Sequence, residues 1–240
     1  SIENFPTFSD KHSLFEADLF FSIGGDGTLL ESVTFIQEKQ IPIFGINTGR
    51  LGFLANTSAT GLSSIIDDIL NKKFSIEQRT LVQFHQENDT EPIFGDMKFA
   101  LNEFAIAKRD TSSMITVHTY LNGSYLNSYW GDGLIIATPT GSTGYSMSCG
   151  GPIVMPTSNV LLVTPICPHN LNTRPLIVSD DAVFSFEVEA RSKKILLSLD
   201  YRSKAVEAKS HFLVKKANFT VQLVSLSKDS FVKSLRSKLH

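Results

Sequence analysis

The stretch that decides the fold is GGDGTLLE, residues 24–31, which follows the apolar run LFFSI at residues 19–23. An apolar run, a glycine turn and a helical pattern predict a strand, a tight turn and a helix. Gly24, Gly25 and Gly27 allow a sharp turn and the close approach of a ligand. The start of such a helix offers free N–H groups and a positive dipole end, so these glycines and Thr28 form a candidate phosphate site.

Asp26 is the unusual member of this stretch, because a carboxylate repels phosphate unless it binds a metal ion or accepts a proton. It is therefore the candidate catalytic residue, and both roles stay open at this point. The alternative is a structural turn in which Asp26 or Thr28 only caps the helix. The turn is not a Walker loop, because the sequence contains no GxxxxGK[ST].

The segments around the glycine turn predict an α/β domain. Residues 29–39 have helical spacing, residues 41–46 read as a buried strand, and residues 60–72 predict a second helix. A strand, a helix and a strand with short links predict a parallel sheet with a right-handed crossover. The loop NTGRLGFL, residues 47–54, leaves the carboxyl end of the second strand, where open α/β sheets bind ligands. Arg50 in this loop is either a binding residue or a solvated cation.

From about residue 74 to residue 224 the pattern changes to short apolar stretches separated by turn residues, which predicts an antiparallel β domain. We expect a Rossmann-like α/β nucleotide domain, truncated at its N-terminus, and an antiparallel β-sandwich-like domain. The expected boundaries are 1–76 joined by a returning helical segment, 225–240, and 77–224. The predicted strands of the second domain are 80–86, 98–107, 116–120, 133–137, 160–164, 182–189, 194–199, 205–208 and 219–224.

Composition favours a cytosolic globular protein. Of 240 residues, 42% are hydrophobic and 19% are charged, and the net charge of −2 argues against a nucleic-acid or polyanionic-membrane surface. The two cysteines form no CxxC, no apolar run reaches membrane-spanning length, and the histidines lack zinc-site spacing. Because the chain begins with Ser1 and its first strand leads directly into the glycine turn, we expect further residues upstream.

Two adjacent polar residues, Asn102 and Glu103, interrupt the apolar strand 98–107. Successive strand residues face opposite sides, so one of the two must point inward. A buried amide or carboxylate costs several kcal/mol without partners, so it is either satisfied internally or binds a ligand. Asn can pair with the donor and acceptor edge of adenine, and Glu can hold ribose hydroxyls.

The other polar concentration is WGDGLIIATPTGSTGYSMSCGGP, residues 130–152, in which a strand ends in a loop rich in glycine and hydroxyl groups. Such a loop offers many backbone N–H groups and Oγ atoms to a polar ligand, and Tyr145 adds a flat surface for a base or ribose. The loop lacks the GxSxG spacing of a serine hydrolase. A surface turn is the alternative to a binding loop.

Taken together, GGDGT at 24–28, NTGRLGF at 47–53, NE at 102–103 and the segment 132–152 resemble the NAD kinase family in order and setting. PICPHNLNTRP at 165–175 and LRSKL at 235–239 also resemble that family. The resemblance implies transfer of the γ-phosphate of ATP to the 2′-hydroxyl of the adenosine ribose of NAD, giving NADP. It implies Mg²⁺ or another divalent cation, a cytoplasmic homodimer or homotetramer, and Asp26 as the proton acceptor.

The resemblance also implies roles for individual residues. Glu103 would hold a ribose, and Asp132 with the backbone near Cys167 would face the nicotinamide half. The residues implied for adenine and its ribose are Asn102, Thr143, Gly144, Tyr145 and Ser148. The implied NAD-binding set is completed by Asp26, Gly27, Thr140, Ser146 and Met147. This chain has Glu31 where many members have Arg, Gly144 where Ala is usual, and Tyr201 where Gly is frequent.

Two other functions compete with this interpretation. GGDGT is shared with diacylglycerol and sphingosine kinases, but a lipid kinase needs an amphipathic membrane face, which is absent from the pattern outside the C-terminal tail. A non-catalytic NAD-sensing module would keep the binding loop, although an intact Asp26 disfavours it. Either ATP or polyphosphate can be the phosphate donor on the sequence alone.

Overall fold

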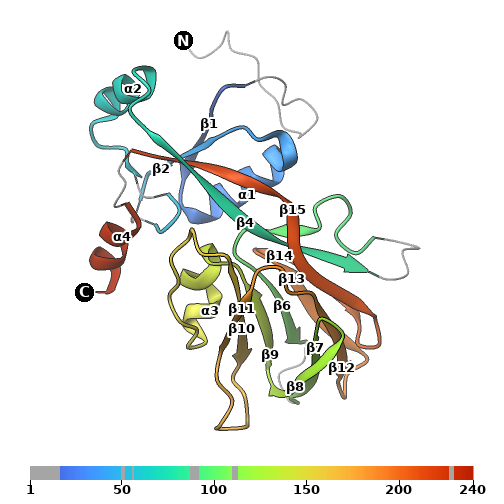
Figure 1. The fold of residues 1–240 in the computed structure, drawn as a ribbon. Coiled ribbons are helices and arrows are strands. Elements are labelled where there is room, and N and C mark those ends of the chain that lie inside the picture. The colour runs from blue at the N-terminus through green and yellow to red at the C-terminus, as the bar shows by residue number, and fades with distance from the viewer. Residues whose placement is uncertain are drawn as a thin grey trace. The chain divides into compact units, whose positions relative to one another are not determined.

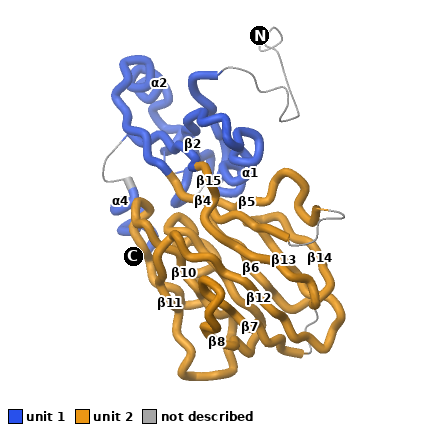
Figure 2. The backbone as a smooth tube through the Cα atoms, turned by 45° about the vertical axis from the view of Figure 1, so that its right-hand side comes forward, with its two compact units in different colours: residues 1–78, 220–240 blue, residues 79–219 orange. Residues whose placement is uncertain are grey.

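The computed structural model describes residues 17–49, 52–55, 57–86, 92–109, 113–226 and 230–239. The chain forms two compact units, residues 1–78 with 220–240 (unit 1) and residues 79–219 (unit 2), as Figure 2 shows. Both boundaries fall inside long strands, β4 (Ser75–Gln86) and β15 (Phe212–Ser225). Arg50 lies outside the described residues.

Unit 1 is built on the strand, helix and strand around the glycine turn (Figure 1). β1 (Phe20–Gly24) lies parallel to β2 (Ile43–Asn47), with α1 (Asp26–Ile36) between them in the chain and a short 3₁₀ turn, η3 (Gln37–Lys39), after it. The predicted unit is confirmed. The helix begins three residues earlier than expected, so Asp26 lies in its first turn.

Short elements complete the sheet and the core of unit 1. β3 (Thr57–Ser58) and the end of β15 both pair in parallel with β2. α2 (Leu62–Leu70) and α4 (Ser230–Leu239) also belong to this unit. A cluster of buried side chains includes Phe44, Ile46, Ile65 and Val224. Gly45 of β2 leaves room for α1, because a Cβ there would lie 2.9 Å from Leu29 Cδ1.

Unit 2 contains two sets of antiparallel strands, which confirms the expected β-sandwich-like fold. The first runs in the order β15, β12 (Phe184–Glu189), β7 (Ile115–Leu121) and β8 (Ser124–Gly131), and β4 pairs with β15 and with β5 (Phe99–Ala100). The second runs in the order β11 (Leu176–Ser179), β10 (Val160–Ile166), β9 (Gly133–Ala137), β6 (Glu103–Lys108), β13 (Lys194–Leu199) and β14 (Arg202–Glu207).

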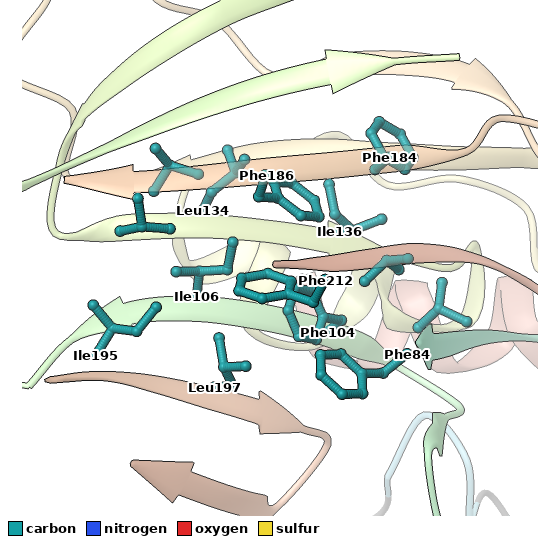
Figure 3. Close-up of a cluster of buried hydrophobic side chains, with 14 of the residues drawn as sticks. Phe84, Phe104, Ile106, Leu134, Ile136, Phe184, Phe186, Ile195, Leu197 and Phe212 are labelled. Carbon is teal, nitrogen blue, oxygen red and sulfur yellow. The ribbon is translucent and has the colours of Figure 1, made fainter. Parts of the chain in front are cut away.

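Phenylalanines from both sheets form the core of unit 2 (Figure 3). The ring of Phe104 on β6 lies 5.8 Å from that of Phe84 and 5.9 Å from that of Phe212. In β9, Leu134 and Ile136 join this core, while the alternate residues join a second cluster on the other face of the sheet. β9 is therefore buried on both faces, which explains its uninterrupted apolar sequence.

Several predicted boundaries were wrong. The strand expected at 98–107 is interrupted at residues 101–102, β15 begins at Phe212 rather than at 219, and β14 begins at Arg202 rather than at 205. β8 and β11 were not predicted, because Ser124, Asn127 and Ser128 interrupt the apolar pattern of β8 and β11 has only four residues. The loop after β9 contains a 3₁₀ turn, η4 (Thr140–Thr143), and a one-turn helix, α3 (Tyr145–Ser148). Among the described helices, none has the length and apolar character needed to span a membrane.

Candidate functional site

The carboxylate of Asp26 is held by the loop that follows β2. Oδ2 accepts a hydrogen bond from the N–H of Phe53 at 2.9 Å, and Oδ1 accepts from the N–H groups of Leu54 and Ala55 at 3.1 and 2.9 Å. An ionised carboxylate has about four acceptor positions, so this arrangement leaves one for another partner. The residue before α1 is Gly25, and no described side chain caps the helix there, so the interpretation of Asp26 or Thr28 as a simple cap was wrong.

The glycines around Asp26 differ in what they permit. A Cβ on Gly52 would lie 1.8 Å from Asp26 Oδ1, so only glycine lets the loop approach this carboxylate. A Cβ on Gly24 would lie 2.3 Å from Thr28 Oγ1. By contrast, no described atom lies within 4 Å of a Cβ built on Gly25 or Gly27. Gly25 and Gly27 are therefore the two positions that leave the start of α1 open to an anion.

The C-terminal helix supports the loop that holds Asp26. The ring of Phe231 on α4 lies 6.3 Å from that of Phe53, and Lys238 Nζ lies 4.8 Å from the centre of the Phe53 ring. The same Phe53 donates its N–H to Asp26. The segment expected to return to the first domain thus packs against the residue that orients the candidate catalytic carboxylate.

In unit 2, Asn102 and Glu103 lie at the break between β5 and β6. The N–H groups of residues 101, 102 and 103 all donate to the carboxylate of Asp200, at 2.9, 2.7 and 3.3 Å. On the other side, Thr138 donates from Oγ1 to the Leu101 carbonyl at 2.6 Å and from its N–H to the Asn102 carbonyl at 2.9 Å. The backbone of the break is therefore fully hydrogen-bonded, although it belongs to neither strand.

Glu103 is a buried carboxyl group with an unused oxygen. Its residue is 9% exposed, and Oε2 has no hydrogen-bond partner in the part of the chain that the structure describes. Burial raises the pKa of Glu103 to about 8, the charge of Asp200 adds to the increase, and a backbone hydrogen bond from Tyr145 opposes it. At neutral pH the carboxyl group is mostly protonated, so it can both donate and accept a hydrogen bond.

Two glycines bring the loop after β9 against this pair. A Cβ on Gly141 would lie 2.0 Å from the carbonyl oxygen of Asn102, and a Cβ on Gly144 would lie 3.0 Å from Glu103 Oε2 and 3.5 Å from Asn102 Nδ2. With the hydrogen bond from Tyr145, these contacts bring Asn102, Glu103, Gly144 and Tyr145 into one cluster. The carboxyl and amide groups face Gly144, the residue that precedes α3.

The hydroxyl groups of the loop do not all face outward. Ser146 is fully buried, and its Oγ lies 2.8 Å from Thr164 Oγ1. Thr140 is also buried, and its Oγ1 accepts a hydrogen bond from Arg79 at 3.4 Å. Tyr145 and Ser148 are exposed, while Thr143 and Met147 are half-buried. The side chains of Ser146 and Thr140 are therefore hydrogen-bonded in the interior of unit 2, whereas the four other side chains are at least partly accessible.

Asp132 and Cys167 lie near Tyr145 as well. Burial raises the pKa of Tyr145, and the acidic groups of Cys149, Cys167 and Asp132 add to the increase. Asp132 Oδ1 forms an ion pair with Lys108 Nζ at 2.7 Å, a partner that sequence analysis missed.

Thr138 and Asp200 also belong to this site, and neither was predicted from the sequence. Thr138 stood inside the candidate loop, but its contact with the break at residues 101–102 depends on the pairing of β9 with β6. One feature of the sequence indicated that Asp200 has a role, because it is an acidic residue between two predicted strands. Nothing in the sequence indicated that its carboxylate would reach residues 101–103.

Metal ligands do not gather anywhere in the described residues, where no group of three or more His, Cys, Asp and Glu side chains could hold an ion. Mg²⁺ commonly binds through one or two carboxylates together with substrate phosphates and water. Asp26, at the open start of α1 and with one acceptor position left, fits that kind of donor.

An open helix start beside a held carboxylate, and a separate cluster of amide, carboxyl and aromatic groups, define a nucleotide-binding protein. Comparison with known families makes the class specific. Residues 6–74 match the ATP-NAD kinase N-terminal domain, and residues 101–226 match the ATP-NAD kinase C-terminal domain. The chain belongs to the NAD kinase family.

Individual relatives agree with this assignment. The chain is 53% identical to the NAD kinase of Cytophaga hutchinsonii and 46% identical to that of Flavobacterium psychrophilum, over 98% and 99% of this chain and 80% of each relative. Among solved structures it is similar to an NAD kinase from Archaeoglobus fulgidus in complex with ATP, with a TM-score of 0.78 and 29% identity over 92% of this chain and 82% of that one. The fold is also that of yeast NADH kinase complexed with NADH, with a TM-score of 0.84 and 24% identity over 93% of this chain and 66% of that one.

Proposed function

We propose that this chain is an NAD kinase, which transfers the γ-phosphate of ATP to the 2′-hydroxyl of the adenosine ribose of NAD and forms NADP. The observation that carries the proposal is the cluster of Asn102, Glu103 and Tyr145. It presents an amide, a buried carboxyl group with an unused oxygen, and an exposed aromatic ring. These are the groups that an adenine and a ribose require, and a family whose members are named NAD kinases supplies the rest of the support.

Different residues of unit 2 bind different parts of the dinucleotide. The amide of Asn102 pairs with adenine, the ring of Tyr145 stacks on the adenosine, and Glu103 holds a ribose hydroxyl. Thr143, Gly144, Met147 and Ser148 line the same part of the loop. Asp132 and the backbone at Cys167 face the nicotinamide half. Thr140 and Ser146 act from the interior, where their buried hydroxyl groups keep the loop in shape.

The groups of unit 1 act on the phosphoryl group. Catalysis of phosphoryl transfer rests on positioning and on stabilising charge that spreads over the equatorial oxygens. The backbone around Gly25 and Gly27 presents the N–H groups at the start of α1 to the ATP phosphates. Asp26 accepts the proton of the 2′-hydroxyl through the acceptor position that its three backbone hydrogen bonds leave open.

A divalent cation, Mg²⁺ by preference, belongs to this proposal. Bound to the ATP phosphates, it supplies positive charge that neutralises their oxygens. Asp26 is the carboxylate that would hold the cation. This role is the alternative to its role as the base that accepts the proton. Metal titration of the Asp26→Asn variant separates the two roles. If Asp26 is the base, the variant needs the same Mg²⁺ concentration for half-maximal activity as the wild type. If Asp26 binds the cation, the variant needs a higher Mg²⁺ concentration.

The test incubates the purified chain with ATP, Mg²⁺ and NAD and measures NADP with an NADP-specific dehydrogenase. We expect NADP at a rate that depends on all three components. Replacing NAD by diacylglycerol or sphingosine, and ATP by polyphosphate, tests the other acceptors and the other donor. Phosphorylated lipid in place of NADP would assign the chain to the lipid kinases, and NAD binding without any NADP would make it a sensing module.

The assembly is also part of the proposal. We infer a homodimer or homotetramer, because β11 lies at the end of its sheet and carries the exposed apolar residues Leu176 and Ile177. Exposed edge strands of this kind pair readily with another chain. Light scattering after size exclusion, at the concentration of the assay, would contradict the inference if it gave the mass of one chain. A cytosolic location agrees with the two free cysteines.

A further inference from the structure

The turn between β13 and β14 contains a residue to which the proposed function gives no role. Asp200 has a φ of 52°, in the left-handed region that favours glycine. A residue with a side chain persists in such a conformation where surrounding contacts determine it. The contacts of this side chain therefore indicate what holds the turn in place.

Asp200 is joined to residues 101–103 by four hydrogen bonds. Its Oδ2 accepts from the N–H of Leu101, and its Oδ1 accepts from the N–H groups of Asn102 and Glu103. In return, the N–H of Asp200 donates to the carbonyl of Glu103 at 3.0 Å. Burial raises the pKa of Asp200, while these N–H groups and Arg202 oppose the increase.

The segment needs such an acceptor because it lies between two strands. β5 ends at Ala100 and β6 begins at Glu103, so residues 101 and 102 belong to neither strand. Buried N–H groups without acceptors are costly. Thr138 provides donors for the carbonyl groups of residues 101 and 102, but it provides no acceptor for their N–H groups. A carboxylate can accept all three N–H groups at once, which a neutral amide or hydroxyl does poorly.

Arg202 extends the contact upstream. Its guanidinium donates to the carbonyl groups of Met97, at 2.6 Å, and of Phe99, and it lies 5.6 Å from the centre of the Phe99 ring. The turn at Asp200 therefore holds the chain both before the break and at it. The directions of the Asn102 and Glu103 side chains follow from the backbone that Asp200 holds.

We propose that Asp200 is a positioning residue for NAD, which acts through Asn102 and Glu103 by holding their backbone from the β13–β14 turn. The inference rests on the proposed function, because it assigns NAD to the side chains that Asp200 orients. Asp200 itself does not contact the dinucleotide in this proposal. Its loss should therefore change the handling of NAD and leave the handling of ATP unchanged.

The variant that tests this is Asp200→Asn, because asparagine has the same shape, tolerates the left-handed conformation and cannot accept all three N–H groups. We expect the KM for NAD to rise about 10- to 100-fold, the size of effect that small misplacements produce, and the KM for ATP to stay within about twofold. The matched control is Asn122→Ala. Asn122 occupies the β7–β8 turn with a φ of 51°, and its Oδ1 accepts the N–H of Val183 at 2.9 Å. Its loss weakens another turn of unit 2 and should leave the KM for NAD unchanged.

Two further measurements distinguish positioning from a general loss of stability. In an Asn102→Ala background, Asp200→Asn should raise the KM for NAD by a smaller factor than in the wild type, because the side chain that it orients is absent. Hydrogen exchange should speed up at the amides of residues 101–103 in Asp200→Asn and not in Asn122→Ala.

The outcomes separate this inference from the proposed function. A wild-type chain that makes no NADP would overturn the proposed function, and the exchange rates would still decide whether Asp200 holds the segment. An active wild type whose Asp200→Asn variant keeps its KM for NAD would overturn the inference. The inference would also be overturned if the KM for NAD in the double variant rose by the product of the factors measured for Asn102→Ala and Asp200→Asn alone.

Discussion

Three backbone N–H groups converge on the carboxylate of Asp26, so its direction is determined by the loop after β2 rather than by its own helix. A group that transfers a proton in a transition state benefits from such a fixed direction, because no reorganisation is needed during the reaction. The cost is that most of its acceptor capacity is used by the protein. The remaining position decides which substrate atom it can contact.

At the residue scale, we predict that Asp26→Asn lowers kcat about 100- to 10,000-fold, the range for loss of a general base. The side chain keeps its shape, but the amide cannot accept the proton, and its Nδ2 cannot replace the carboxylate oxygen that accepts a backbone N–H from the loop after β2. Steady-state kinetics with varied NAD and ATP measure the effect, and a urea unfolding curve checks that the variant is folded. A folded variant with nearly normal kcat would show that Asp26 is not the base.

Glu103 gives a prediction about pH. Its folded pKa of about 8 lies above the ordinary value of 4.5, so between these two values the folded chain keeps a proton that the unfolded chain has lost. The free energy of unfolding therefore falls as pH rises from about 4.5 to 8. Glu103→Gln should reduce this slope by up to about 1.4 kcal/mol per pH unit. The raised pKa of Asp200 acts in the same direction, and its contribution remains in the variant.

Urea unfolding at intervals from pH 5 to pH 8 measures the slope. The control is Glu187→Gln, because Glu187 is exposed on β12. We expect the control to follow the wild type. Parallel curves for Glu103→Gln and the wild type would contradict a strongly raised pKa at Glu103.

At the scale of elements, Thr138 connects the loop after β9 to the break between β5 and β6. Its Oγ1 donates to the Leu101 carbonyl at 2.6 Å and accepts the N–H of Gly141 at 3.1 Å, in a fully buried place. Thr138→Val removes both hydrogen bonds without changing the volume much. We predict a loss of about 2–6 kcal/mol in the free energy of unfolding, since each of the two buried polar groups left unpaired costs about 1–3 kcal/mol.

Thr138→Ser is the matched variant, because it keeps the hydroxyl group and loses one methyl, which costs about 1 kcal/mol. Denaturant unfolding of both variants gives the comparison. We also expect the KM for NAD to rise in the valine variant alone, because the break carries Asn102 and Glu103. Equal losses in both variants would mean that the methyl, and not the hydrogen bonds, matters at this position.

Elements with a local signal were predictable, and those that depend on distant partners were less so. Residues 19–47 show a strand, a helix and a strand because apolar spacing and glycines act within a few residues. In β8, Ser124, Asn127 and Ser128 separate the aromatic and apolar residues, and the place of β8 beside β7 follows from the turn at Asn122 and Gly123. The polar pair Asn102 and Glu103 was visible in the sequence, but the apolar residues on both sides of it still predicted one strand, so the break at residues 101–102 was not predicted.

At the scale of the whole molecule, the proposed roles divide between the two units. Unit 1 carries Asp26 and the open start of α1, and unit 2 carries the groups proposed to bind NAD. We predict that Tyr145→Ala raises the KM for NAD at least about tenfold through lost stacking, which is worth about 1–3 kcal/mol per base, while its kcat stays within about threefold. Asp26→Asn should show the opposite division between kcat and KM. Calorimetric titration of NAD into both variants checks the binding directly, and equal losses of NAD affinity would contradict the division.

From the sequence we predicted the α/β and β-sandwich-like class, the start of α1 at the glycine turn to within three residues, and the candidate residues from Asp26 to Cys167. The class and the start of α1 follow from local periodicity and from backbone freedom at glycine, whereas the candidate residues come from side-chain chemistry within short motifs and from the resemblance to the NAD kinase family. Which of those side chains are accessible, and which groups hold them, became known from the three-dimensional fold. Asp200 meets residues that precede it by 97 to 99 positions, Lys108 pairs with Asp132, and Ser146 turns into the interior. Contacts of that kind depend on which strands pair and in what register, and no short stretch of sequence contains that information.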